Sequence, residues 1–205
     1  EADILNEDII LTIVGYANGS CVNVSSSMTL SIIPGVTADA GSDDEVCNTE
    51  STYAVTDATA EDYVTVAWTT DGDGTFTSSS VLNPTYTFGT TDLLGGTVTL
   101  TLTATGGGTC GTAVDSKEIT VTPQAQISAG SDASICEGQS YTLSGASGSN
   151  YASVLWSTNG TGTFDDATLL NAEYTPSEAD ILNEDIILTI VGYANGSCMN
   201  VRSYM

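Results

Sequence analysis

Apolar and polar residues alternate along much of the chain. In the segment 97–103, Val98, Leu100 and Leu102 alternate strictly with threonines, which is the two-residue period of a strand with one buried and one exposed face. The same alternation predicts further strands, with inward faces formed by Val64, Val66 and Trp68, by Tyr53 and Val55, and by Ile119 and Val121. Since no stretch has a sustained 3.6-residue apolar period, the pattern predicts an all-β chain.

The pattern also recurs over long distances. Residues 1–28 return at 178–205 with 25 of 28 positions identical, at an offset of 177. Such a near-copy indicates a recent duplication, so we expect the chain to be a section of a longer tandem array.

A second and older repeat lies inside the first. Cys47 aligns with Cys136 and Pro34 with Pro123 at an offset of 89, and Trp68 then aligns with Trp156 at an offset of 88. At the latter offset Tyr86 aligns with Tyr174, Asp92 with Asp180 and Cys110 with Cys198. The array therefore alternates two related types of module, which we call A and B.

These offsets divide the chain into three modules. Residues 1–33 form the C-terminal part of a type A module, residues 34–122 a complete type B module, and residues 123–205 a type A module whose last strand is truncated. A module of about 89 residues is large enough for one modest core.

Each module is predicted to be a two-sheet sandwich of the immunoglobulin type. Glycine, asparagine, aspartate and serine clusters separate the Thr-, Val-, Ile- and Tyr-rich segments at intervals of roughly ten residues. This spacing predicts about seven antiparallel strands per module. Four aromatic residues are predicted to lie in the cores: Trp68, Trp156, Tyr86 and Tyr174.

The F–G hairpins, which join the last two strands of each sandwich, are predicted from the duplicated segment. Residues 1–33 and 178–205 should adopt the same strand pair, with Ile186, Leu188 and Ile190 inward like Ile9, Leu11 and Ile13. The Asn18-Gly19 and Asn195-Gly196 pairs are interpreted as type I′ turns rather than as glycosylation sites.

Composition excludes several classes of partner. Two basic residues stand against 26 acidic ones, for a formal net charge of −24. Nucleic acid is excluded because binding phosphates requires clustered Lys and Arg, and docking on anionic lipid is disfavoured for the same reason. The sequence contains no apolar run of about 18 residues, so no direct membrane insertion is expected.

The five cysteines predict disulfides and an extracellular location. One pairing joins Cys47 to Cys110 and Cys136 to Cys198 within modules. The other joins Cys47 to Cys198 across a module junction, because Cys47 and Cys110 would lie at opposite ends of an immunoglobulin-like sandwich. Both pairings stay open, and under both the partner of Cys21 would precede residue 1.

Cofactor chemistry has little support in the sequence. Asp71 and Asp73, in the run Asp-Gly-Asp-Gly, could supply oxygen ligands to Ca²⁺. The simpler interpretation is a glycine turn, since the type A module has Asn159-Gly-Thr161-Gly there. No other cofactor is expected. With no histidine in the chain, neither a Ser-His-Asp nor a Cys-His site can form, and we expect no enzyme.

The module resembles a known class of repeats. The run from AGSD through a tryptophan strand, NPTYTF and a closing ITVTP is similar to the PKD-like and Ig-like tandem repeats of giant bacterial cell-surface adhesins. Those of Bacteroidota, including the SprB-type gliding adhesins, are the most similar in pattern. The resemblance implies secretion to the cell surface and a role in cell adhesion or gliding motility.

Two kinds of function follow for such an array. The first is a structural stalk or filament that projects an adhesive tip and transmits force, with neighbouring modules as its partners. Surface polysaccharide, host or substratum would then be bound by a tip outside this chain. The second is a set of multivalent carbohydrate- or surface-binding modules, which would require a shared exposed aromatic patch, and a further alternative is a surface-layer lattice.

Overall fold

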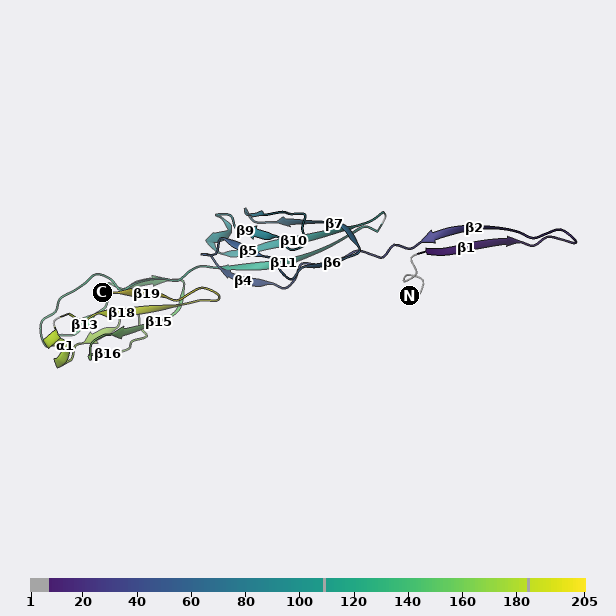
Figure 1. Ribbon diagram of the computed structural model, residues 1–205. Helices are drawn as coiled ribbons and strands as arrows, with labels where there is room; N and C mark the ends of the chain where they lie inside the picture. Colours follow the sequence, from purple (N-terminus) through teal and green to yellow (C-terminus); the bar gives the residue numbers. More distant parts are fainter. Residues whose placement is uncertain (1–7, 109, 184) are drawn as a thin grey trace.

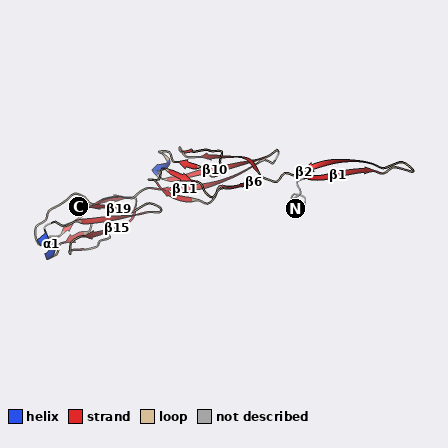
Figure 2. Cartoon of the chain, in the orientation of Figure 1, coloured by secondary structure: helices blue, strands red, loops and turns tan. Residues whose placement is uncertain are grey.

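The structure is a computed structural model that describes residues 8–108, 110–183 and 185–205. Strands are the main regular elements of the described residues, and the helical segments among them are short (Figure 2). Figure 1 shows three parts in a row: a two-stranded hairpin, a complete sandwich and a second sandwich at the C-terminal end. We refer to them below as the first, second and third modules, after the division expected from the repeats, and the all-β fold predicted from the alternation is confirmed.

The second module contains a four-stranded sheet. Its order is β4 (Asp44–Cys47), β11 (Thr112–Thr122), β10 (Gly96–Gly106) and β7 (Tyr63–Thr70). Neighbouring strands are antiparallel except that β4 runs parallel to β11, so that Ile119 faces Asp44 and Thr122 faces Cys47. This parallel edge brings Cys47 to the end of the sheet where β11 leaves the module.

A second layer covers this sheet and consists of two short groups of strands. One pairs β3 (Thr37–Asp39) with β6 (Thr59–Glu61), and the other has the order β5 (Thr52–Ala54), β9 (Thr85–Thr87), β8 (Thr75–Phe76). The 3₁₀ segment η2 (Asp92–Leu94) precedes β10. The arrangement is that of an immunoglobulin-like sandwich, with β10 and β11 as the F–G hairpin.

The core lies between the two layers. Val98, Leu100 and Leu102 are buried as the alternation predicts, and they pack with Trp68 and Tyr86. The Trp68 indole N–H donates to the carbonyl of Leu82 at 3.1 Å, so its polar atom is satisfied. Val64 was predicted on the same inward face but is exposed, because it lies near the end of β7, beyond the core.

The third module repeats this plan. Trp156 and Tyr174 are buried at the centre of its own core, and the Trp156 indole N–H donates to Leu170 as Trp68 does to Leu82. Its strands are β12 (Gln126–Ser128) paired with β14 (Ser147–Ser149), β13 (Tyr141–Thr142) with β17 (Glu173–Thr175) and β16 (Thr163–Phe164), and β15 (Tyr151–Thr158) with β18 (Leu188–Ala194) and β19 (Val201–Tyr204). The segment 133–136, equivalent to β4, forms no strand.

The duplicated hairpins share one register, as predicted. Thr12 faces Ser27 where β1 (Asp8–Gly15) pairs with β2 (Val24–Ser31), and Thr189 faces Tyr204 at the offset of 177. Leu188 and Ile190 are buried, whereas their counterparts Leu11 and Ile13 are exposed because no second layer covers the first hairpin.

Two local predictions about the duplicated segment are wrong. Residues 178–183 form a short helix, α1 (Glu178–Asn183), where a strand pair had been expected; their copies at 1–6 lie outside the described residues. The Asn-Gly pairs also do not form type I′ turns, because only the glycines, Gly19 and Gly196, have positive φ. Each hairpin loop is longer than two residues, so the I′ geometry is not required.

Candidate functional site at the module junction

The second and third modules are joined by a very short connection. Strand β11 ends at Thr122, Pro123 follows, and β12 begins at Gln126. Proline fixes φ and lacks a backbone donor, so it suits the point where the chain leaves one sheet and enters the next. The side chain of Ala125 is buried, and the connection has no Gly/Ser-rich tract that would make it a flexible linker.

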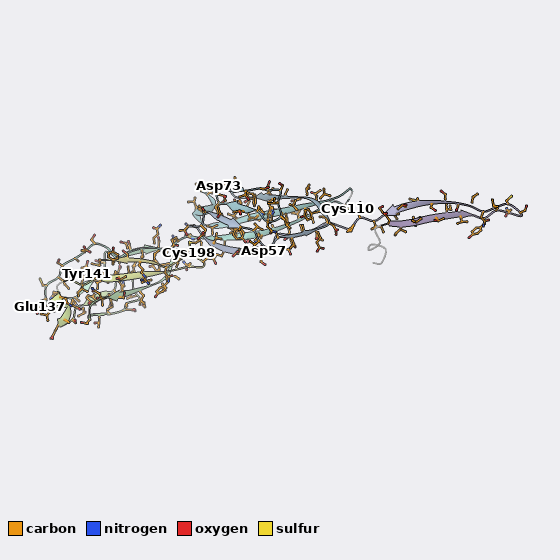
Figure 3. The ribbon with its side chains drawn as sticks, in the orientation of Figure 1. Asp57, Asp73, Cys110, Glu137, Tyr141 and Cys198 are labelled. Carbon is orange, nitrogen blue, oxygen red and sulfur yellow. A yellow bond between two sulfur atoms is a disulfide. The ribbon has the colours of Figure 1, made fainter. Side chains whose placement is uncertain are left out.

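A disulfide crosses this junction. Cys47, at the end of β4, is bonded to Cys198, in the loop between β18 and β19, and their Cα atoms are 4.8 Å apart, within the usual range for a disulfide. Of the two pairings that the sequence left open, the structure has the one between modules. Figure 3 places Cys198 where the second and third parts of the chain meet.

The within-module alternative is wrong for a geometric reason. Cys47 lies beside Thr122, whereas Cys110 precedes Thr112 at the opposite end of β11. A strand rises about 3.3 Å per residue, so the two cysteines are separated by roughly 30 Å. Figure 3 shows Cys110 at the end of the second module that faces the β1–β2 hairpin.

Hydrogen bonds surround the disulfide and connect both modules to the short connection. The Asn48 backbone N–H donates to the Thr122 carbonyl at 2.9 Å, and the Asn48 side-chain oxygen accepts from the Gln124 N–H at 2.9 Å. The Gln124 side-chain amide donates to the Met199 carbonyl at 2.6 Å. Gln124 is therefore bonded to residues of both modules.

A carboxylate on β4 forms a second contact across the junction. Glu45 accepts the backbone N–H of Ser197 at 3.3 Å and the hydroxyl of Thr122. Gly196 lies against this carboxylate with φ of 51°, and a Cβ at this position would lie 1.5 Å from Glu45 Oε1. The positive φ favours glycine in the loop between β18 and β19, and any other residue at this position would displace the Glu45 carboxylate.

The other three cysteines are free thiols in this chain: Cys21, Cys110 and Cys136. Cys110 nevertheless occupies a place like that of Cys198. Its Sγ is 3.7 Å from the carbonyl oxygen of Ile33, and the Sγ of Cys198 is 3.3 Å from that of Thr122. Ile33 and Thr122 each directly precede the junction proline, so the two junctions present the F–G cysteine in the same way.

The calcium interpretation of Asp71 and Asp73 is not supported. The two carboxylates accept hydrogen bonds from different partners: Asp71 from the N–H and hydroxyl of Thr99, and Asp73 from the N–H groups of Thr91 and Asp92. The N–H of Thr91 contributes most to lowering the pKa of Asp73 to about 2, and that of Thr99 most to lowering the pKa of Asp71. Within the described residues no group of three or more acidic or cysteine side chains is placed to hold a metal ion.

Close packing explains why glycine follows Asp71 and, in the third module, Asn159. A Cβ on Gly72 would lie 2.3 Å from Asp92 Oδ1, and one on Gly160 would lie 2.4 Å from Asp180 Oδ1. Both aspartates are buried and each accepts a hydrogen bond of 2.7 Å from a core tyrosine, Tyr86 or Tyr174. The two modules therefore share glycine at this turn, because a residue without a side chain leaves room for the buried carboxylate and the tyrosine hydroxyl.

Sequence analysis did not identify Asp92 and Asp180 as structural residues. The available signal was their position: each lies six residues after its tyrosine in both modules. Glu45, Asn48 and Gln124 were also missed, and they carry no such signal because their contacts depend on how two modules meet.

Comparisons with known proteins identify no family for this chain. No protein-family model matches, and no match is found among curated proteins. Among solved structures the chain is similar to one described as protocadherin gamma B2 extracellular cadherin domains 1–5, with 10% sequence identity and a TM-score of 0.36. The alignment covers 97% of this chain and 45% of that one, so the chain spans less than half of its length.

Proposed function

We propose that the chain is a stalk repeat of a large, secreted bacterial surface protein, in which sandwich modules are held end to end by junction disulfides. The observation that carries the proposal is the junction itself: a short connection, a disulfide between modules, and hydrogen bonds from both modules to Gln124. A binding module needs an exposed site, whereas a stalk needs resistance to bending where modules meet.

The proposal includes the same disulfide at every junction of an array. In an array a type A module precedes the second module, and its copy of Cys136 aligns with Cys47. Cys110 would pair with that copy of Cys136. Cys136 would in turn pair with a Cys110-type residue of a following type B module. The position of Cys110 beside Ile33 supports this pattern.

The finer role follows the sequence resemblance. We place the array at the cell surface, where it projects an adhesive tip as in the SprB-type gliding adhesins and transmits force in adhesion or gliding. Its high negative charge keeps long arrays soluble and mutually repelling. Among the described residues none of the helices has the length and apolar character needed to cross a membrane.

Neither the tryptophans nor the position of Tyr16 supports the binding alternative. Both tryptophans are buried. Tyr16 and its copy Tyr193 are exposed, but Thr105 stands at this position in the second module. The modules therefore do not share this exposed aromatic residue.

Small-angle X-ray scattering on the 205-residue chain tests the stalk. If the three modules lie end to end with their strands along the long axis, the maximum dimension should be about 100–120 Å under oxidising conditions. Reductant, or the variant C47S/C198S, should allow bending and broaden the distance distribution, and C110S serves as the matched control. A maximum dimension far below the summed lengths would exclude the rod, and a profile insensitive to reduction would exclude the role of the disulfide.

A further inference from the structure

Two side chains at the junction of the second and third modules bind the same loop. Glu45, on β4, accepts the backbone N–H of Ser197 at 3.3 Å, and Gln124, in the short connection, donates to the carbonyl of Met199 at 2.6 Å. Both partners are backbone groups of the loop between β18 and β19, which also carries Cys198. The junction therefore has two hydrogen bonds to this loop besides the disulfide and the connection.

The two covalent links by themselves leave one motion free. Thr122 faces Cys47 across β11 and β4, so the disulfide and the connection after Thr122 lie on a line that crosses the two strands. The modules can rotate about this line. Glu45 faces Thr120, two positions back along the strands and roughly 7 Å from the line. Its hydrogen bond to the loop therefore opposes the rotation.

The other kind of junction lacks both side chains. The junction described above joins a type B module to a type A module, whereas the one before Pro34 joins type A to type B. At the repeat offset of 89, Ser134 stands in place of Glu45 and Gly35 in place of Gln124. A serine side chain is two carbon–carbon bonds shorter than that of glutamate, and glycine has none. Neither residue can make the contact of its counterpart.

The loops that these side chains face are alike at both junctions. Figure 3 shows Cys198 and Cys110 at the two ends of the second module, and each cysteine follows a glycine of similar conformation, with φ of 51° at Gly196 and 59° at Gly108. Since Glu45 and Gln124 bind only backbone groups of the loop, the loop sequence does not account for the difference. The difference lies in the side chains on the opposite side of the junction.

We infer that the array alternates two kinds of joint. Junctions from type B to type A are clamped by Glu45 and Gln124, whereas junctions from type A to type B act as hinges about the connection and the disulfide. Gly35 adds to the freedom of the hinge, because glycine allows more backbone conformations than other residues. The inference rests on the proposed stalk with a disulfide at each junction. Such a stalk consists of rigid two-module segments and bends only between them.

An exchange of the two side chains tests the inference in the 205-residue chain. The variant E45S/Q124G gives the clamped junction the residues of the hinge and leaves both cysteines unchanged. Residual dipolar couplings of the isotope-labelled chain measure the alignment of each module separately. In the wild type the second and third modules should share one alignment tensor, as parts of one rigid body do. In the variant, with the disulfide intact, their alignment tensors should differ.

The disulfide provides an independent measurement. Its equilibrium with reduced and oxidised glutathione should shift about tenfold toward reduction in E45S/Q124G, because two hydrogen bonds no longer hold Cys198 beside Cys47. The matched control E118S/Q139G carries the same two changes at exposed positions away from the junction and should behave as the wild type. E45Q keeps an oxygen that can accept the Ser197 N–H, so it should keep the shared alignment.

The possible failures distinguish this inference from the stalk itself. A shared alignment in E45S/Q124G would overturn the alternation of joints and leave the stalk proposal standing. An equal loss of shared alignment in E118S/Q139G would also overturn it, because the effect would not come from the junction. Different alignments in the oxidised wild type would overturn both proposals, since the junction would then be flexible with its clamp intact.

Discussion

The buried carboxylate of Asp180 connects several parts of the third module. It accepts hydrogen bonds from the backbone N–H groups of Thr161, Gly162 and Ser177, and from the Tyr174 hydroxyl. Asp92 has the equivalent role in the second module, where it accepts from Asp73, Gly89 and Tyr86. Each aspartate thus fixes the glycine turn after the tryptophan strand against the segment that leads into the F–G hairpin.

The hydrogen bonds of Asp180 predict an acid-sensitive module. The N–H of Thr161 contributes most to lowering the pKa of Asp180 well below its ordinary value of 3.8. A carboxyl whose pKa is lowered in the folded state contributes stability above its unfolded pKa, and this contribution is lost as pH falls through the folded value. The stability of the third module should therefore decrease steadily below about pH 4.

The variant D180N separates this effect from general acid denaturation. It should be less stable than the wild type at pH 7 and show a smaller further loss between about pH 4 and pH 2, because the group that titrates is gone. Urea denaturation at several pH values measures both, and E178Q, an exposed change in α1, is the control. Parallel pH dependence in D180N and wild type would contradict the role assigned to Asp180.

A buried lysine distinguishes the second module from the third. Lys117 on β11 is almost completely buried, its ammonium is 2.9 Å from Asp57 Oδ1, and it lies 5.3 Å from the centre of the Tyr53 ring. Burial would lower the pKa of Lys117, but hydrogen bonds to Tyr53 and Asp57 outweigh burial and raise it. Figure 3 shows Asp57 in the second module.

The type A module lacks both members of this ion pair. By the repeat offsets, Met205 stands where the second module has Lys117, and Gly145 stands in place of Asp57. A buried charge without its partner is costly, whereas an apolar replacement of the whole pair can be neutral. The type A module therefore has neither the buried charge nor its partner.

A double-mutant cycle tests this coupling. D57G alone should destabilise the second module by about 1–2 kcal/mol, because it leaves the buried Lys117 without its carboxylate; the loss is smaller than for a fully buried pair since the Asp57 side chain is 43% exposed. The double variant D57G/K117M, which copies the type A pair, should recover most of that loss. The free energies of unfolding come from urea denaturation. Additive losses in the double variant would mean that the pair is not coupled.

At the level of strands, the sequence predicted what a two-residue period can determine. The inward faces of β10 and β11 and the shared register of the two duplicated hairpins follow from alternation, since a slip by one residue would turn every apolar side chain outward. The four core aromatics followed from their repeated positions.

Other elements depend on contacts that alternation does not encode. The parallel pairing of β4 with β11 fixes Cys47 at the junction, but the short sequence of β4, two acidic residues followed by Val and Cys, has no alternation that would indicate it. The cysteine pairing stayed open for this reason. Residues 8–10 are in a strand while the identical 185–187 are not, so their local sequence alone does not determine their secondary structure.

At the level of the whole molecule, the junction disulfide joins two modules that each have their own core. It therefore limits how one module can move relative to the other, rather than connecting parts of one core. The hydrogen bonds of Glu45 and Gln124 across the same junction act in the same direction.

The same disulfide also changes the covalent path that carries tension when the ends of the chain are pulled. Cys47 and Cys198 are 151 positions apart, so the shortest path passes through the sulfur atoms and leaves residues 48–197 outside it. Even if both sandwiches unfolded, these residues could not lengthen the tether while the bond is intact. Single-molecule stretching should show roughly 500 Å of additional contour length only after reduction. Equal extension with and without reductant would contradict this path. Residues 48–197 thus add no length to the chain when it is oxidised and form a long, compliant segment when it is reduced, so the redox state of its surroundings sets how far these residues can lengthen the chain.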